Sequence, residues 1–279
     1  MANDRIRSGL KKGARFMPKR LHKRLMNLSG QGTQRSIIKL ADDPRRFDGY
    51  CFVAGLHRSG TTVLEHYIAA HFEISVLRAN VAENEGQHLQ DVMPVARDHG
   101  GPGRFAFDPA MHLAPPDRGE ADVARDRLLR LWTPWAVGEA PMLLEKSPPN
   151  LTRIGWLRTV FPGARFIVMV RDPRVSAAAT QKWSQTSIEE LIYHWHVAHA
   201  AAQAAWGPDC IGIRYEDFCA DPNAQLDRIA ETGFLARRAE PLPIEPRFAD
   251  LGNSNDKYLQ STPTKMLGPG AWDFFGPWF

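Results

Sequence analysis

The chain has 279 residues, of which 43% are hydrophobic and 24% are charged. These proportions predict one large globular domain with a substantial core and exclude disorder throughout. Apolar runs such as residues 166–170 are too short to span a membrane, and the basic N-terminus lacks the apolar core and small-residue cleavage site of a secretory signal. We therefore expect a cytoplasmic protein.

Positive charge is concentrated in an N-terminal arm, residues 1–35. Ten Lys or Arg and one acid give the arm a charge of +9, which leaves −5 for residues 36–279 out of a total of +4. Apolar and basic residues alternate, which fits either an amphipathic helix that contacts an anionic membrane through residues 1–28 or a solvated, disordered arm. The first interpretation predicts a protein peripheral to the inner face of the membrane. The arm has no recognisable nucleic-acid motif, so no nucleic-acid partner is expected.

The remaining residues, 36–279, alternate between strand and helix patterns. An apolar run at residues 50–54 predicts a strand, which is followed by a Gly-bounded loop and a helix over residues 62–70. A second strand is predicted at residues 142–144, before a Pro-Pro step and a helix over residues 150–160. Residues 99–116, rich in Gly and Pro, predict a loop or lid over one end of the sheet.

The second half of the chain continues the alternation. Residues 166–170 form a continuous β-branched-rich run, which predicts a buried parallel strand central to the sheet. Ser187 and Glu190 form a capping box before a helix that reaches about residue 206. A strand follows at residues 210–214, and Asp221 and Pro222 start a helix to about residue 232. The fold class is therefore α/β, a P-loop-type three-layer fold with a central parallel sheet flanked by helices.

Three cysteines, Cys51, Cys210 and Cys219, include no C-x-x-C pair. They predict reduced thiols rather than a disulfide framework or a zinc cluster. His194, His196 and His199 lie on one predicted helix, but spacings of two and three do not put all three rings on one face. We expect them to pack on the helix surface rather than to bind a metal.

A phosphate-binding loop is predicted at residues 55–62, between the first strand and the first helix. Gly55 and Gly60 have the spacing of a P-loop, which surrounds a phosphate with backbone N–H groups and a helix N-terminus. Thr61 stands where a nucleoside triphosphatase has its Lys, whereas Arg58 supplies a cation earlier in the loop. The loop thus predicts a phosphate site that lacks the Lys needed for a triphosphate.

Four motifs in chain order resemble sulfotransferases that use 3'-phosphoadenylyl sulfate (PAPS), most closely their tyrosylprotein, heparan and bacterial carbohydrate branch. The R-S-G-T-T of residues 58–62 resembles the 5'-phosphosulfate loop, and the V-R-D-P-R of residues 170–174 resembles the 3'-phosphate segment. The L-E-K-S-P of residues 144–148 is similar to a heparan-type E-K-[ST]-P segment, and the I-R-Y-E-D of residues 213–217 to a late strand end. The matches span residues 50 to about 230, so residues 36–279 are expected to form a sulfotransferase-like domain.

The resemblance implies PAPS as the donor, adenosine 3',5'-bisphosphate as its product, and no metal requirement. The implied acceptor is a hydroxyl or amine, with a carbohydrate or glycolipid favoured. Arg58 and Lys146 would stabilise charge during transfer. The family's Ser eight residues after Arg171 is Ala179 here, which leaves Ser176 and Thr180 as hydroxyls for the 3'-phosphate. The implied donor contacts are Arg58, Ser59, Gly60, Thr61, Thr62, Arg171, Ser176, Thr180 and Tyr215.

The resemblance also implies a catalytic base in the segment after the first helix, here residues 81–88. Glu85 is the first candidate, with Glu83 and His88 as alternatives, and solvated loop charges are the remaining interpretation. Two competing functions stay open. One is a P-loop kinase or nucleotide hydrolase that uses Asp172 as a magnesium ligand. The other is a non-catalytic protein that binds a membrane or nucleic acid through its basic arm.

Overall fold

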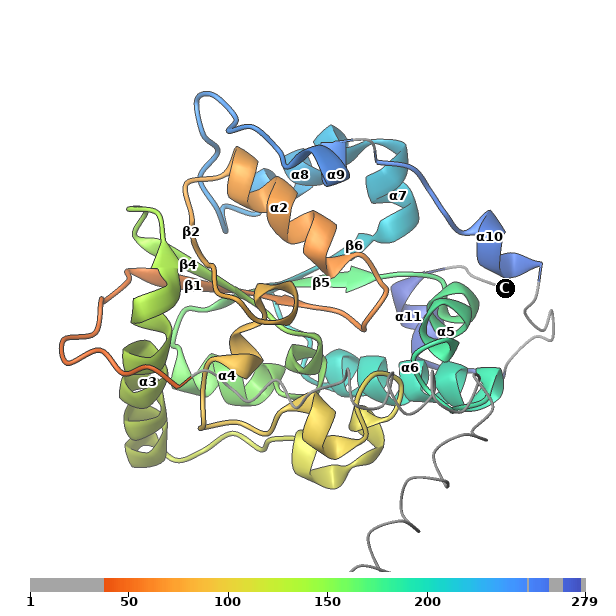
Figure 1. Ribbon diagram of the computed structural model, residues 1–279, viewed down its shortest axis with the longest axis horizontal. Helices are drawn as coiled ribbons and strands as arrows, with labels where there is room; N and C mark the ends of the chain where they lie inside the picture. Colours follow the sequence, from red (N-terminus) through yellow and green to blue (C-terminus); the bar gives the residue numbers. More distant parts are fainter. Residues whose placement is uncertain (1–37, 250, 261–267, 277–279) are drawn as a thin grey trace, which may run out of the picture. The chain divides into compact units, whose positions relative to one another are not determined.

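The computed structural model describes residues 38–249, 251–260 and 268–276 (Figure 1). The N-terminal arm therefore lies outside the described residues, and its predicted helix or solvated form stays a prediction. Within the described ranges, no helix has both the length and the apolar character needed to cross a membrane.

A six-stranded sheet forms the centre of residues 38–276, with the strand order β3-β2-β4-β1-β5-β6. Neighbouring strands are parallel except for the antiparallel pair β2 and β3. The strands are β1 (Gly49–Ala54), β2 (Ser75–Leu77), β3 (Ala136–Val137), β4 (Met142–Lys146), β5 (Arg165–Val170) and β6 (Cys210–Arg214).

Helices cover both faces of the sheet, as Figure 1 shows. α2 (Thr61–His71), α7 (Tyr215–Ala220), α8 (Pro222–Glu231) and α9 (Pro246–Ala249) lie on one side. The other side carries α3 (Arg118–Trp132), α4 (Ile154–Val160), α5 (Pro173–Gln181), α6 (Ile188–Ala204) and α11 (Ala271–Phe275). The short helix α10 (Asp256–Leu259) lies against α5. The three-layer α/β prediction is confirmed.

Two hydrophobic cores result from the two-residue period of the strands. In β1, Tyr50 and Phe52 point into the core beneath α3, α4 and α6, whereas Cys51 and Val53 point into the core beneath α2 and α8. β5 divides its apolar residues in the same way. Because both faces of these strands are buried, their sequences are continuously apolar.

Most predicted elements are confirmed, with differences at their ends and in their order. Strand β5 is interior but lies second from the edge, between β1 and β6, so β1 rather than β5 is central. The helix predicted over residues 150–160 is divided into a 3-10 turn (Pro148–Thr152) and α4, because Arg153 between them has a φ of −142°. The predicted lid contains short 3-10 turns and is anchored by the fully buried Phe105 and Met111.

Candidate active site

The phosphate loop, residues 55–62, joins β1 to α2 at the carboxyl end of the parallel strands. Gly60, the N-cap of α2, has a φ of 101°, and a Cβ atom there would lie 2.6 Å from Cδ2 of Tyr215. Gly55 has a φ of 153°, and a Cβ atom there would lie 2.6 Å from the Met169 carbonyl oxygen. Glycine is required at both positions by backbone conformation and by space.

The N-terminus of α2 is open to an anion. Its N-cap residue makes no side-chain capping bond, so the first N–H groups of the helix are left for another partner. The buried Ser59 hydroxyl donates to the Leu56 carbonyl oxygen at 2.6 Å and fixes the turn of the loop. Thr61 is buried and Thr62 half-buried in the first turn of α2. This arrangement fits a phosphate group.

Arg58 contributes to the loop in two ways. Its backbone is in the left-handed region, with a φ of 69°, and its carbonyl oxygen accepts a hydrogen bond from Nη1 of Arg171 at 2.9 Å. Its exposed guanidinium lies over the Trp183 ring, 4.6 Å from the ring centroid. The loop is therefore joined to the end of β5 through its backbone, while the Arg58 charge lies at the surface.

Arg171 follows β5 and is held by the tail segment, which we define as residues 251–260. Its Nη2 atom donates to Ser254 Oγ at 2.9 Å, and its Nε atom donates to Asn255 Oδ1 at 3.0 Å. The guanidinium lies over the Tyr215 ring, 4.0 Å from the centroid. Burial lowers the pKa of Arg171. The predicted 3'-phosphate contacts Arg171 and Tyr215 thus lie together, with the tail segment against them.

Glu216 fixes the tail segment to the end of β5. One of its carboxylate oxygens, Oε1, accepts from Asn255 Nδ2 at 2.7 Å and from the Asp172 backbone N–H at 3.1 Å. Asn255 in turn orients the Arg171 guanidinium. Within the R-Y-E-D motif, Tyr215 therefore places its ring against Arg171, and Glu216 positions Asn255. The role of Glu216 was not predicted from the sequence.

A buried carboxylate and ammonium meet at the same end of the sheet. Nζ of Lys146, the last residue of β4, lies 3.4 Å from Oε1 of Glu85, and both side chains are almost completely buried. His88 Nε2 lies 3.6 Å from the other Glu85 oxygen. Burial alone would raise the pKa of Glu85, but Lys146 and hydrogen bonds from His88 and Gln87 outweigh it and lower the pKa to about 2. Glu85 is thus a carboxylate at neutral pH.

Glu145 positions this pair. Its Oε1 atom accepts from the Gly86 backbone N–H at 3.0 Å, and its Oε2 atom accepts from Asn150 Nδ2 at 2.7 Å. A Cβ atom on Gly86 would lie 2.6 Å from Cγ of Glu145, so the loop approaches β4 only because this residue is glycine. The contact holds Glu85, one residue earlier, beside Lys146.

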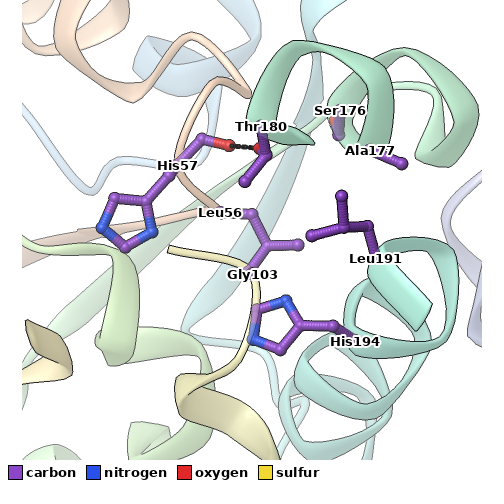
Figure 2. Close-up of a pocket in the computed structure, with 8 residues that line it drawn as sticks. All are labelled: Leu56, His57, Gly103, Ser176, Ala177, Thr180, Leu191 and His194. Atoms are coloured by element: carbon purple, nitrogen blue, oxygen red, sulfur yellow. Dashed lines mark hydrogen bonds between the residues drawn. The ribbon is translucent and has the colours of Figure 1, made fainter. Parts of the chain in front are cut away.

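A small pocket lies between the phosphate loop, the loop at Gly103, α5 and α6 (Figure 2). Ser176 and Thr180 line it from α5, and the Thr180 hydroxyl donates to the His57 carbonyl oxygen at 3.5 Å. The Ser176 hydroxyl donates to the Arg171 carbonyl oxygen, also at 3.5 Å. Both hydroxyls therefore contact backbone oxygens next to the predicted donor contacts.

A model of the sulfotransferase family matches residues 51–233, which is more than half of the chain. The chain belongs to the sulfotransferase family. The resemblance inferred from the four motifs is confirmed at the level of the family.

Individual relatives of this family member are distant. Protein-tyrosine sulfotransferase A of Caenorhabditis elegans is 22% identical over 223 residues, which cover 71% of this chain and 53% of that protein. The chain thus spans about half the length of this curated relative. Two solved structures, each 16% identical, are a sulfotransferase from Alicyclobacillus acidocaldarius and the sulfotransferase domain of the Synechococcus PCC 7002 olefin synthase. The first similarity covers 74% of this chain and 89% of that chain with a TM-score of 0.44, and the second covers 78% and 85% with a TM-score of 0.45.

The three candidates for the catalytic base lie in different surroundings. Glu85 is buried beside Lys146, and His88 contacts Glu85 rather than Lys146. The Glu83 side chain is exposed, and Glu83 instead offers its carbonyl oxygen to Lys146 Nζ at 2.8 Å. The geometry favours Glu85 among the three.

The three histidines on α6 have separate partners. His194 Nε2 accepts from the Ala106 N–H, His196 Nδ1 accepts from the Ala271 N–H, and His199 Nδ1 donates to the Trp195 carbonyl oxygen. Over the described ranges, no group of three or more Asp, Glu, His or Cys is arranged to hold a metal ion. The three rings thus have separate backbone partners, and His194 and His199 are buried rather than at the helix surface as predicted.

Proposed function

We propose that the chain is a sulfotransferase that moves a sulfuryl group from PAPS to a hydroxyl or amine of an acceptor. One observation carries the proposal: the uncapped phosphate loop and the buried Glu85–Lys146 pair lie at the same end of the parallel sheet. Ligands of open α/β sheets bind at the carboxyl ends of the strands. The family match supports this assignment.

The donor end of the proposed site consists of the phosphate loop and Arg171. The N–H groups of residues 59–62 and the Arg58 guanidinium would hold the 5'-phosphate and the charge that forms on it. The Arg171 guanidinium would form paired hydrogen bonds to the 3'-phosphate, beside Tyr215. Ser176 and Thr180 remain the α5 hydroxyls proposed for that phosphate, and both lie close to Arg171 or the loop.

The acceptor end of the proposed site is the Glu85–Lys146 pair. The acceptor hydroxyl would lose its proton to Glu85 as its oxygen forms the new bond to sulfur, and the bond from sulfur to the phosphate oxygen would break. Lys146 would stabilise the negative charge on the transferring group. The proximity of Lys146 to Glu85 supports a direct link between the two roles: a donor oxygen that attracts Lys146 would weaken its hold on Glu85 and make the carboxylate a stronger base.

The kinase alternative is less compatible with the surroundings of Asp172. The Asp172 carboxylate caps α5 by accepting from the Arg174 N–H at 2.8 Å, and its other oxygen pairs with the Arg174 guanidinium at 2.6 Å. A magnesium ion there would have to compete with the Arg174 guanidinium, which contacts both carboxylate oxygens. Thr61, where a kinase would need Lys, is buried in α2.

A thermal-shift titration tests the donor class. Because a ligand that binds only the folded state raises its stability, adenosine 3',5'-bisphosphate should stabilise the protein more than 5'-AMP or Mg-ATP. Arg171→Lys, which keeps the charge but loses the paired geometry, should remove most of the preference for the bisphosphate. Arg130→Lys, on α3, is the matched control and should keep the preference for the bisphosphate. Stabilisation by Mg-ATP with no preference for the 3'-phosphate would contradict the proposal and favour the kinase.

A further inference from the structure

One ring nitrogen of His57 has no hydrogen-bond partner among the described residues. Nine histidines lie within the described ranges, and eight of them form a ring hydrogen bond or an ion pair. His57 is the ninth: its Nδ1 atom is buried and has no hydrogen-bond partner in the described part of the chain. An unpaired buried polar group costs about 1–3 kcal/mol, so it requires an explanation.

The position of His57 is fixed by its neighbours. Its carbonyl oxygen accepts from Thr180, and its ring meets the buried Phe105 edge-on at 5.9 Å. In Figure 2 the ring points away from Leu191 and His194, out of the pocket that its backbone lines. Glu85, Lys146 and His88 all act electrostatically on this ring. His57 lies in the loop that follows β1, and Val53 of β1 is in register with Lys146 of β4, so the unpartnered nitrogen of His57 lies at the same end of the sheet as the Glu85–Lys146 pair.

A purely structural role does not account for this ring. His199 has one unpartnered nitrogen in the core, but its Nδ1 atom bonds the Trp195 carbonyl oxygen and its ring stacks on Trp195 at 3.7 Å. His57 Nδ1 has no such bond within the described ranges, and His57 lies one residue before Arg58, within the phosphate loop. His88 adds a second unpartnered Nδ1 atom beside Glu85. Two imidazole nitrogens at this end of the sheet thus lack a hydrogen bond that a polar group of a ligand would supply.

We propose that His57 is an acceptor-binding residue, whose Nδ1 atom hydrogen-bonds an uncharged hydroxyl of the acceptor and directs it towards Glu85. The inference rests on the proposed sulfuryl transfer. A hydroxyl both donates and accepts a hydrogen bond, so it pairs with either tautomer of a neutral imidazole. His57 forms no covalent bond, and the hydroxyl proton passes to Glu85.

Charge balance restricts the acceptor class. Burial lowers the pKa of His57, which keeps its ring neutral at pH 7. Lys146, the cation in contact with Glu85, is already paired with it. A carboxylate or phosphate placed next to the reacting hydroxyl would be buried beside Glu85 without a counter-ion, at a cost of several kcal/mol. The reacting portion of the acceptor is therefore a neutral alcohol, such as an uncharged sugar ring or a phenol.

Ring nitrogen NMR on the full chain, labelled with 15N-histidine and saturated with adenosine 3',5'-bisphosphate, tests this inference. The probes are two neutral alcohols, methyl β-D-glucopyranoside and phenol, and their charged counterparts, methyl β-D-glucuronide and 4-hydroxybenzoate. The His57 signals, assigned by their absence in His57→Gln, should shift with a neutral probe. The charged counterpart should bind at least about tenfold more weakly.

Two variants separate this role from a structural one. His57→Gln should keep the thermal stabilisation by adenosine 3',5'-bisphosphate but lose binding of the neutral probe. His71→Gln, a half-buried histidine on α2, should change neither. The inference is overturned if no neutral probe shifts the His57 signals, or if the charged counterparts bind as tightly. Failure of the bisphosphate to bind the wild type would instead reject the proposed donor, a separate result.

Discussion

At the scale of single residues, the most demanding feature is the buried Glu85–Lys146 pair. Two opposite charges 3.4 Å apart stabilise each other only while both are present, because either charge alone would be buried without compensation. Lys146 is also held by the Glu83 carbonyl oxygen at 2.8 Å. The pair is therefore a structural contact and also contains the proposed catalytic residues. Substitutions of Glu85 or Lys146 must be assessed for folding as well as for activity.

Glu85→Gln should change how stability depends on pH. The folded-state pKa of Glu85, about 2, lies below its unfolded value, so its contribution is present above about pH 4.3 and is lost as pH falls towards 2. Urea unfolding at a series of pH values measures the free energy of unfolding. Over this window it should fall by on the order of 3 kcal/mol more in the wild type than in Glu85→Gln. Asp91→Asn, another carboxylate with a lowered pKa but at the surface, is the control and should have a much smaller effect. Parallel pH profiles for wild type and Glu85→Gln would contradict the assignment.

The candidates for the site came from local motifs and from position along the chain. Lys146 was proposed because residues 144–148 resemble a family motif, and Glu85 because its segment follows the first helix, where the family has its base. His57, Ser254 and Asn255 were not assigned, because their roles depend on contacts with residues far away in the sequence. Ser254 meets Arg171 across 83 residues, and no spacing rule connects the two. Partner choice at this range is decided by tertiary packing.

At the scale of elements, the tail segment deserves a test of its own. Arg171 donates to Ser254 Oγ, whereas the position on α5 that carries a hydroxyl in the family is the fully buried Ala179. Ser254 can keep Arg171 as donor and give its own proton to a phosphate oxygen. We therefore expect Ser254→Ala to weaken binding of adenosine 3',5'-bisphosphate by about 10- to 100-fold in calorimetry, because hydrogen bonds to charged groups contribute about 1.5–3 kcal/mol. Affinity for 5'-AMP should hardly change.

Three further variants locate the hydroxyl. Gln260→Ala, exposed in the same segment, should leave both affinities unchanged. Ser176→Ala and Thr180→Val test the two hydroxyls that the sequence predicted on α5. If either of these lowers the bisphosphate affinity and Ser254→Ala does not, the 3'-phosphate contact lies on α5 and the tail segment has only a packing role.

Element prediction succeeded where the capping chemistry is local. The Ser187–Glu190 capping box and the Asp221 cap start α6 and α8 as expected. A second capping box, Asp117 with Glu120, starts the 15-residue helix α3. This helix was not predicted, although the capping signal is present in the sequence. The order of strands in the sheet was harder to predict, because parallel neighbours are set by crossover packing rather than by the strands themselves.

At the scale of the whole molecule, the layered fold explains why distant motifs converge. Strands β1, β4, β5 and β6 are parallel, so their carboxyl ends lie at one edge of the sheet. The phosphate loop, Lys146, Arg171 and Tyr215 each follow or end one of these strands. This convergence was predictable from the sequence, because alternating strands and helices give a parallel sheet with its loops gathered at one end. The residues that complete the site come from connections with less regular patterns.

The N-terminal arm and the domain formed by residues 36–279 should have independent functions. Residues 36–279 form one compact unit and contain every proposed donor and acceptor contact, so deletion of residues 1–35 should preserve the thermal stabilisation by adenosine 3',5'-bisphosphate.

The arm carries +9, and each basic residue near an anionic surface contributes about 1 kcal/mol, so the full chain should sediment with phosphatidylglycerol-containing vesicles and detach as salt is raised. The deletion variant should not sediment, and Lys19→Gln with Lys23→Gln should sediment less. Equal sedimentation with pure phosphatidylcholine would contradict electrostatic binding, and loss of bisphosphate binding on deletion would make the arm part of the donor site.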